Sequence, residues 1–290
     1  MQFTIQLISG LAVGCIYALV AVGFSMIYRA LGLVNFAQGD IMMLGAFVGY
    51  SLFVIWPGMP FLLVLLLAAA ITAVAGALIE RIAFHGAVKR GADQIYLVLL
   101  TLGIGMVLSN GARLIWGANP VVYPTPLTHE VYHFLGYPLP AVYLYIGFTM
   151  IALLLGLQWF FSRTWMGLAV RAAADDRETA ATMGINSGLA AAVSFAIASA
   201  TGALAGVLYA PITFASFDMG VVGVKAFAAA IIGTLGSVPG AVIGGLIIGV
   251  GETFGAQLIS NAYMDSIAFA IMILILLVYP TGLMPKGRRL

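Results

Sequence analysis

Long, apolar stretches without charged residues repeat along the chain and are separated by short polar segments. Each is close to or longer than the roughly 20 residues that a helix needs to cross a hydrocarbon core of about 30 Å. The stretch 41–79 is too long for one helix, and Trp-Pro-Gly-Met-Pro interrupts it at 56–60, which predicts two helices joined by a turn. The charge-free stretches are 1–28, 41–79, 94–112, 141–161, 179–217, 226–251 and 266–284.

The stretch 226–251 is broken at 236–240, which predicts a short helix followed by a second helix. Together the stretches predict an all-α, polytopic integral membrane protein. A single transmembrane domain is expected to cover residues 1–290 and to contain about nine helices, with eight to ten compatible with the pattern. Glycine and polar residues interrupt the pattern near 30–40 and 211–240, where we expect broken or re-entrant segments.

Composition supports the same fold class. Hydrophobic residues make up 63% of the 290 residues and charged residues only 8%, against about a quarter in soluble domains. This balance excludes a soluble globular domain and a disordered tail, and a net charge of +2 is too small to indicate a nucleic-acid partner. Cys15 is the one cysteine in the sequence, so no intrachain disulfide can form.

The loops differ in their content of Lys and Arg. With nine spans, only Arg113 and Lys225 fall on one side, and all other basic residues fall on the opposite side. Because cytoplasmic loops carry the excess of Lys and Arg, the carboxyl terminus is expected inside and the amino terminus outside. The basic set is Arg29, Arg81, Lys89, Arg90, Arg163, Arg171, Arg177, Lys286, Arg288 and Arg289.

Polar and charged side chains within or beside the spans are candidates for lining a polar cavity or supporting it. A charge at the bilayer centre costs about 2.5–3.5 kcal/mol on insertion scales, so its retention needs a reason. The simpler interpretation places such groups at the headgroup level, and for Lys225 it is at least as good. The candidate residues are Asn35, Gln38, Asp40, Lys225 and Glu252.

Glycines four residues apart recur between positions 233 and 255. Small residues at this interval let helix backbones approach closely in lipid, so we expect a tight helix contact within the chain or with a partner subunit. The glycines expected to pack in this way are Gly236, Gly240, Gly244, Gly245 and Gly249.

The loop 162–188 on the basic side is alanine-rich and contains Arg171 and Asp175, which are spaced to share one helical face. Gly184 is a good helix stop, so the loop predicts one short surface helix over about 168–183. This helix either docks a cytoplasmic protein or is a solvated connector.

One catalytic signature is present in an unfavourable context, and another is absent from the sequence. His129, Glu130 and His133 match the H-E-x-x-H zinc-peptidase pattern, but they lie in a proline-rich outer loop, and the remaining histidine, His85, is expected on the opposite side. We therefore expect no metal site. The sequence contains no G-x-x-x-x-G-K-[ST] phosphate loop, so this chain is not expected to be an enzyme, and any ATP hydrolysis would take place in another subunit.

Three segments together resemble the LivH-type permeases of bacterial branched-chain amino acid ABC importers. They are Gly32–Asp40 with Met43–Ala46, Lys225–Ser237 with Gly240-Ala241 and Gly244-Gly245, and the loop from Arg171 through Asp176 to Gly184-Ile185. The resemblance covers nearly the whole chain.

ABC permeases carry a cytoplasmic coupling loop of the form E-A-A-x-x-x-G. Glu178 and Gly184 keep its spacing, although Thr179 replaces the first alanine. The resemblance therefore favours ATPase docking for the loop 162–188. The residues implied in coupling are Arg171, Asp175, Asp176, Arg177, Glu178, Ala181 and Gly184.

The resemblance implies a permease subunit in the bacterial inner (cytoplasmic) membrane that imports branched-chain or related hydrophobic amino acids. Its partners would be a second homologous permease, two cytoplasmic ATPase subunits that bind ATP and Mg²⁺, and a periplasmic substrate-binding protein. This chain itself would bind no cofactor. The alternatives are an ABC permease for urea, amides or another small solute, an ATP-independent secondary transporter with Asp40 or Glu252 carrying a proton, and an intramembrane zinc protease. Whether the permease pair is a heterodimer or a homodimer is left open.

Overall fold

Helices make up most of the described part of the protein. The computed structural model describes residues 2–125, 127, 131–134, 137–258, 260 and 263–284. In this part of the chain, nine apolar helices lie where the sequence predicts them. They are α1 (Gln2–Leu31), α2 (Gln38–Ile55), α3 (Phe61–Ile79), α5 (Gln94–Trp116), α6 (Ala141–Arg163), α9 (Ser187–Tyr209), α10 (Gly220–Ile232), α11 (Val238–Leu258) and α12 (Met264–Val278).

Seven of these helices are long and apolar enough to cross a membrane, counting only the residues that the structure describes. The other two, α10 and α12, have 13 and 15 residues. At 1.5 Å per residue α10 spans about 20 Å, less than the thickness of the hydrocarbon core, so it cannot cross the membrane as one regular helix. The predicted all-α polytopic fold is confirmed, with interruptions near 30–40 and 211–240.

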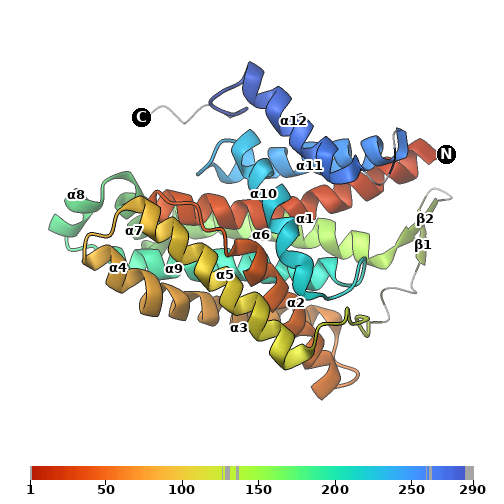
Figure 1. Ribbon diagram of the computed structural model, residues 1–290, viewed down its shortest axis with the longest axis horizontal. Helices are drawn as coiled ribbons and strands as arrows, with labels where there is room; N and C mark the ends of the chain where they lie inside the picture. The colour runs from red at the N-terminus through yellow and green to blue at the C-terminus, as the bar shows by residue number, and fades with distance from the viewer. Residues whose placement is uncertain are drawn as a thin grey trace.

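Shorter elements lie at the two ends of the bundle. At one end, α3 continues through a π-helix, η1 (Glu80–Phe84), into α4 (His85–Lys89), and two further helices, α7 (Trp165–Asp175) and α8 (Arg177–Thr182), follow α6. At the opposite end, an antiparallel hairpin of β1 (Val131–Phe134) and β2 (Tyr137–Pro140) lies beside the start of α1 (Figure 1).

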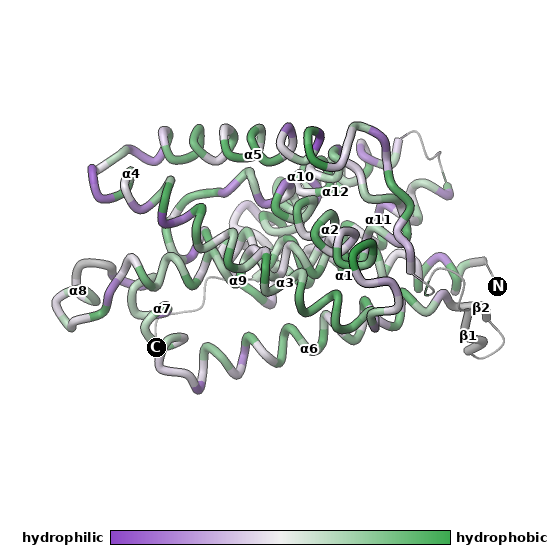
Figure 2. The backbone as a smooth tube through the Cα atoms, turned by 90° about the horizontal axis from the view of Figure 1, so that it is seen from below, coloured by the Kyte–Doolittle hydropathy of each residue, from purple (hydrophilic) through white to green (hydrophobic). Residues whose placement is uncertain are grey.

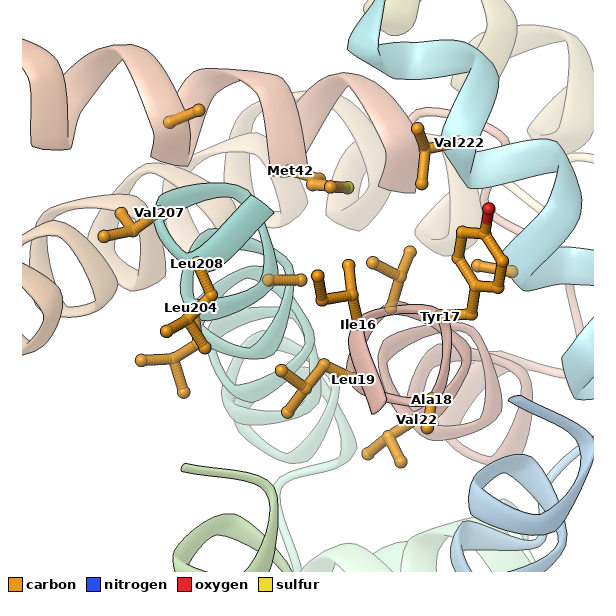
Figure 3. Close-up of a cluster of buried hydrophobic side chains, with 14 of the residues drawn as sticks. Ile16, Tyr17, Ala18, Leu19, Val22, Met42, Leu204, Val207, Leu208 and Val222 are labelled. Atoms are coloured by element: carbon orange, nitrogen blue, oxygen red, sulfur yellow. The ribbon is translucent and has the colours of Figure 1, made fainter. Parts of the chain in front are cut away.

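The helix α1 runs through the middle of the bundle, with α5 and α6 along opposite edges (Figure 2). In the apolar windows, 67% of α1 and 72% of α9 are buried, compared with 22% of α5. The residues 16–22 of α1 are at most 1% exposed. Figure 3 shows Ile16 and Leu19 directed toward α9 and Tyr17 toward α10. A helix that is apolar on all sides is expected at the centre of a bundle, and α1 is such a helix.

Glycines bring α1 and α11 into backbone contact. A Cβ atom added to Gly10 would lie 3.0 Å from the Cα of Val250, and one added to Gly14 would lie 2.9 Å from the Cα of Leu246. A Cβ on Gly249 would overlap the backbone of Gly14. No larger residue fits these positions unless the helices separate.

The other glycines of the predicted packing set have two different environments. A Cβ on Gly245 would overlap Ala18 of α1, and one on Gly240 or Gly244 would overlap carbonyl groups at the end of α10. Gly236 instead lies in the turn between α10 and α11 with a φ of 89°, so the left-handed backbone of the turn, rather than a helix contact, favours glycine there.

The turn after α10 also contacts the chain that follows α12. Thr234 has a φ of 80°, which is unusual for a β-branched residue. Its hydroxyl Oγ1 lies 3.0 Å from the carbonyl oxygen of Thr281 and 2.6 Å from that of Met284. The backbone N–H of Leu283 donates to the carbonyl oxygen of Ile232 at 2.8 Å. The chain after α12 is therefore fastened to the α10–α11 turn.

We expect Gly249→Ala to lower the melting temperature of the detergent-solubilised protein, because the new Cβ would force α1 and α11 apart. Overpacking of this kind destabilises by about 1–3 kcal/mol. The matched control is Gly103→Ala on α5, where a Cβ meets nothing within 4 Å. Alanine at position 103 restricts the unfolded chain, so it should stabilise the folded protein by about 0.4–1 kcal/mol. A Gly249→Ala protein that melts as high as the control would contradict the close-contact interpretation.

Candidate functional site

The segment 32–37 leads from the end of α1 into the interior of the bundle, where α2 begins. Asn35 and Gln38 are only 1% and 0% exposed. The Gln38 Nε2 donates to the carbonyl oxygen of Ala198 in α9 at 2.8 Å, and the backbone N–H of Ala37 donates to Asn35 Oδ1 at 3.2 Å. These bonds fix the beginning of α2 against α9.

Two polar atoms in this region are buried without a partner. Among the described residues, Gln38 Oε1 and Asn35 Nδ2 have no hydrogen-bond partner. Leaving such a group unpaired costs about 1–3 kcal/mol. The region therefore offers an amide acceptor and an amide donor to ordered water or a polar solute.

Asp40 lies where three helices meet. It is half-buried in the first turn of α2, and its carboxylate occupies the space beside Gly105 of α5 and Gly220, the first residue of α10. Gly39 and Gly223 let the starts of α2 and α10 touch, because a Cβ on Gly39 would lie 3.0 Å from the Cα of Gly223. A carboxylate near two helix N-termini is stabilised by their unpaired N–H groups.

A second polar group connects α10, α11 and α12. The Lys225 Nζ of α10 forms ion pairs with Glu252 Oε1 of α11 and, at 2.6 Å, with Asp265 Oδ1 of α12. The side chain of Glu252 is 0% exposed and that of Asp265 is 67% exposed. Lys225 Nζ also lies 5.9 Å from the ring centroid of Tyr17, at the outer limit of a cation–π contact. Lys225 is thus part of a charged cluster inside the helix group.

Aromatic contacts join the segment 32–37 to α10. The ring of Phe227, two residues after Lys225, lies 5.4 Å from that of Phe36 and 5.5 Å from that of Phe24 in α1. Offset or edge-to-face pairs at these distances are favourable. The two polar regions are therefore mechanically connected through α10.

The segments that follow α5 and precede α10 are joined to one another. The backbones of Val121 and Ala215 exchange two hydrogen bonds of 2.9 and 3.0 Å. The guanidinium of Arg113 lies 3.8 Å from the ring centroid of Phe217. Tyr123 is buried beside α2, and this burial raises the pKa of its hydroxyl. These contacts hold the two segments together beside α2.

The predicted helix over 168–183 is in fact two helices, α7 and α8. The chain changes direction at Asp176, whose φ is −152° and ψ is 108°. The Asp176 carboxylate accepts from the backbone N–H of Thr179 at 3.0 Å and from its hydroxyl at 2.6 Å. A side chain that satisfies free N–H groups starts a new helix, and this local bond overrides the helix propensity of the alanine run. Gly184 ends α8 with a φ of 83°.

Only part of α8 is packed against the rest of the protein. Ala180 is buried with Val170, Ala173 and Ala190, which hold α8 against α7 and α9. Ala181 and Gly184 are exposed, and Met183 is 80% exposed. The side chains of Arg177 and Glu178 lie outside the described part of the structure.

The spacing of Arg171 and Asp175 would allow an ion pair, but the described part of the chain shows none between them. Both instead line a cavity of about 1310 Å³ at the same end of the bundle.

Of the zinc-peptidase pattern, His129 and Glu130 lie outside the described residues. The basic residues Lys286, Arg288 and Arg289 of the chain's end also lie outside the described residues. Within the described residues, no group of three or more His, Cys, Asp or Glu side chains is placed to hold a metal ion.

Comparison with known proteins identifies the helical scaffold. Residues 6–276 match the family described as the branched-chain amino acid transport system permease component. The chain belongs to this permease family. It is 33% identical to the high-affinity branched-chain amino acid transport system permease protein BraD of Pseudomonas aeruginosa, over 97% of this chain and 95% of that protein. It is also 33% identical to the LivH permease of the corresponding system in Escherichia coli, over 99% of this chain and 96% of that protein. No solved structure matches.

The family assignment confirms the resemblance and makes the chain a transport permease rather than an enzyme. Sequence analysis missed one member of the charged cluster, Asp265. A signal was present, because Asp265 directly precedes a long apolar stretch, while Lys225 and Glu252 border other spans. The spacing of these residues along the chain could not reveal that they meet.

We expect Lys225→Met to destabilise the protein by about 3–5 kcal/mol, because it leaves the Glu252 carboxylate buried without its cation. The same replacement in a Glu252→Gln background should have a smaller effect. Asp265→Asn should cost only about 0–1 kcal/mol, because Asp265 is largely exposed. The coupling between Lys225 and Glu252 is measured from the melting temperatures, in detergent, of the unchanged protein, the two single variants and the double variant. Equal losses with and without Glu252 would contradict the ion-pair interpretation.

Proposed function

We propose that this chain is the membrane-spanning permease subunit of an ATP-driven ABC importer for branched-chain or related hydrophobic amino acids. The observation that carries the proposal is the α7–α8 pair, which extends beyond the ends of the long helices (Figure 2) in a chain of this permease family. An exposed helix pair held by a small apolar contact suits docking of an ATPase subunit.

The orientation follows from the basic residues. Arg29, Lys89, Arg90 and Arg163 lie at the ends of α1, α4 and α6, at the same end of the bundle as α7 and α8. The positive-inside tendency supports placing this end in the cytoplasm and the start of α1 in the periplasm of a bacterial inner membrane.

The proposed machine has several subunits. A second homologous permease forms the translocation path together with this chain, and two cytoplasmic ATPases bind ATP and Mg²⁺ and dock on α8 and its neighbours. A periplasmic binding protein delivers the amino acid to the hairpin end. Residues proposed to couple to the ATPases are Arg171, Asp175, Asp176, Arg177, Glu178, Ala181 and Gly184.

The path is proposed to pass close to the two polar groups that meet at α10. Asn35, Gln38 and Asp40 would line or support it at the start of α2, and Lys225 and Glu252 would support it between α10 and α11. The unpaired buried amide atoms of Asn35 and Gln38 are the chemical feature that favours contact with a polar solute.

A mild-detergent pull-down of the tagged chain, followed by mass spectrometry, should recover an ATPase and a second permease of similar size. Recovery of the chain alone from membranes in which it is active would contradict the ABC assembly. In proteoliposomes that contain the assembly, leucine uptake should require ATP and persist when the proton gradient is collapsed. Uptake of urea or short amides in place of leucine would assign a different solute, and uptake that survives ATP depletion would indicate a secondary transporter.

We expect Met183→Asp to reduce both ATPase recovery and leucine uptake at least tenfold, because it places a charge at the exposed apolar end of α8. The chain should remain in the membrane at normal abundance. The control is Lys89→Ala, which alters another exposed residue at the same end of the bundle, in α4. Equal ATPase recovery with the two variants would move the docking surface away from α8.

A further inference from the structure

A large cavity lies on the α6 side of α1. Its volume is about 1310 Å³, and its walls come from α1, α6, α7, α11 and the turn before α11. Asp40 lies beside α5, and Figure 2 shows α5 and α6 along opposite edges of the bundle. The cavity is therefore distinct from the polar junction at the starts of α2 and α10.

One end of this cavity is basic. Arg29 at the end of α1 and Arg171 of α7 both line it, and within the described structure neither forms an ion pair with a carboxylate. Asp175 also lines it and is exposed, so the net charge of the lining stays positive. Gln158, Ser162 and Ser237 add uncharged polar groups. Two guanidinium groups that form no ion pair with a described protein carboxylate favour an anion, and phosphate suits their donor geometry.

The remaining wall is apolar and follows the helices into the membrane. The lining residues of α6 run from Leu154 to Ser162, which corresponds to about 12 Å along the helix axis. Leu154, Leu157 and Phe161 form one wall, and Val242 and Ile243 of α11 form another. The buried residues of α6 lie mostly in its first half, so the helix leaves the bundle core as it approaches Arg163.

We propose that this cavity binds an anionic phospholipid, with the headgroup phosphate at Arg29 and Arg171 and the upper acyl chains between α6 and α11. The cavity exceeds the roughly 300–1,000 Å³ typical of small-molecule sites, as a lipid requires. Basic pockets between transmembrane helices near the cytoplasmic surface are the kind of site that selects anionic headgroups. A branched-chain amino acid would leave most of the apolar wall uncovered. The inference rests on the proposed orientation, which places Arg29 and Arg171 at the cytoplasmic side, and is independent of the carried solute.

The test uses the purified chain with its co-purifying partners, after delipidation and transfer to nanodiscs of phosphatidylcholine that contain one-fifth phosphatidylglycerol. Native mass spectrometry should show that the protein retains about ten times more phosphatidylglycerol than phosphatidylcholine, relative to their amounts in the nanodisc. The double variant Arg29→Gln/Arg171→Gln should lose this preference. The matched control, Arg81→Gln/Lys89→Gln, removes the same charge at the same end from residues that do not line the cavity, and should keep it. Equal retention by both double variants would overturn the proposal.

A second pair of variants tests the apolar wall without changing charge. Ile243→Trp should fill the cavity and lower phosphatidylglycerol retention several-fold, whereas Ile273→Trp, on an exposed face of α12, should not. Melting temperatures of both variants confirm folding. Unchanged retention in a folded Ile243→Trp protein would count against acyl chains in the cavity.

Other occupants are distinguished by a photo-crosslinking residue placed at position 158 in intact membranes. A phospholipid-mass adduct on the chain is expected. A crosslink to an ATPase or to a second permease without a lipid adduct would overturn the proposal and assign the cavity to a subunit contact. Displacement of phosphatidylglycerol by 10 mM inorganic phosphate would show a simple anion site instead.

Discussion

Direct backbone contact between α1 and α11 is the constraint on which the arrangement of the other helices depends. Lipid tails are as apolar as the side chains, so the helices associate through close packing rather than through exclusion of water. Gly10, Gly14 and Gly249 permit that packing, and they place α1 at the centre of the bundle. The apolar side chains of α1 then fill the space toward α9, α2 and α10.

Polar chemistry in the interior is concentrated where helices begin or are cut short. The helices α2 and α10 both start inside the bundle, where their first N–H groups lack helical partners and Asp40 provides a carboxylate. Lys225, in the middle of the short helix α10, meets carboxylates from α11 and α12. Irregular backbone at membrane depth is tolerated when protein groups surround it. In the segment 32–37, the ring of Phe36 packs against Phe227 and its backbone N–H donates to the hydroxyl of Thr101.

The positions of the helices could be predicted because long stretches without charged residues mark the segments that enter lipid. The sequence also indicated the interruptions at both ends of α10 and the family. It could not show that residues 225, 252 and 265 meet, since that pairing depends on the three-dimensional order of α10, α11 and α12. The division of α7 from α8 depends on the hydrogen bonds of Asp176, which compete with helix formation in an alanine-rich segment. The spacing of glycines four residues apart likewise could not show that Gly236 lies in a turn whereas Gly244 lies on a helix face.

The last three helices are fastened to one another at two distant points. Lys225 bonds to α11 and α12, and Thr234 bonds to the chain beyond α12. Sliding α10 along its neighbours would break a buried ion pair and release the carbonyl groups of Thr281 and Met284 at the same time. Any movement of α10 would therefore carry α11 and α12 with it.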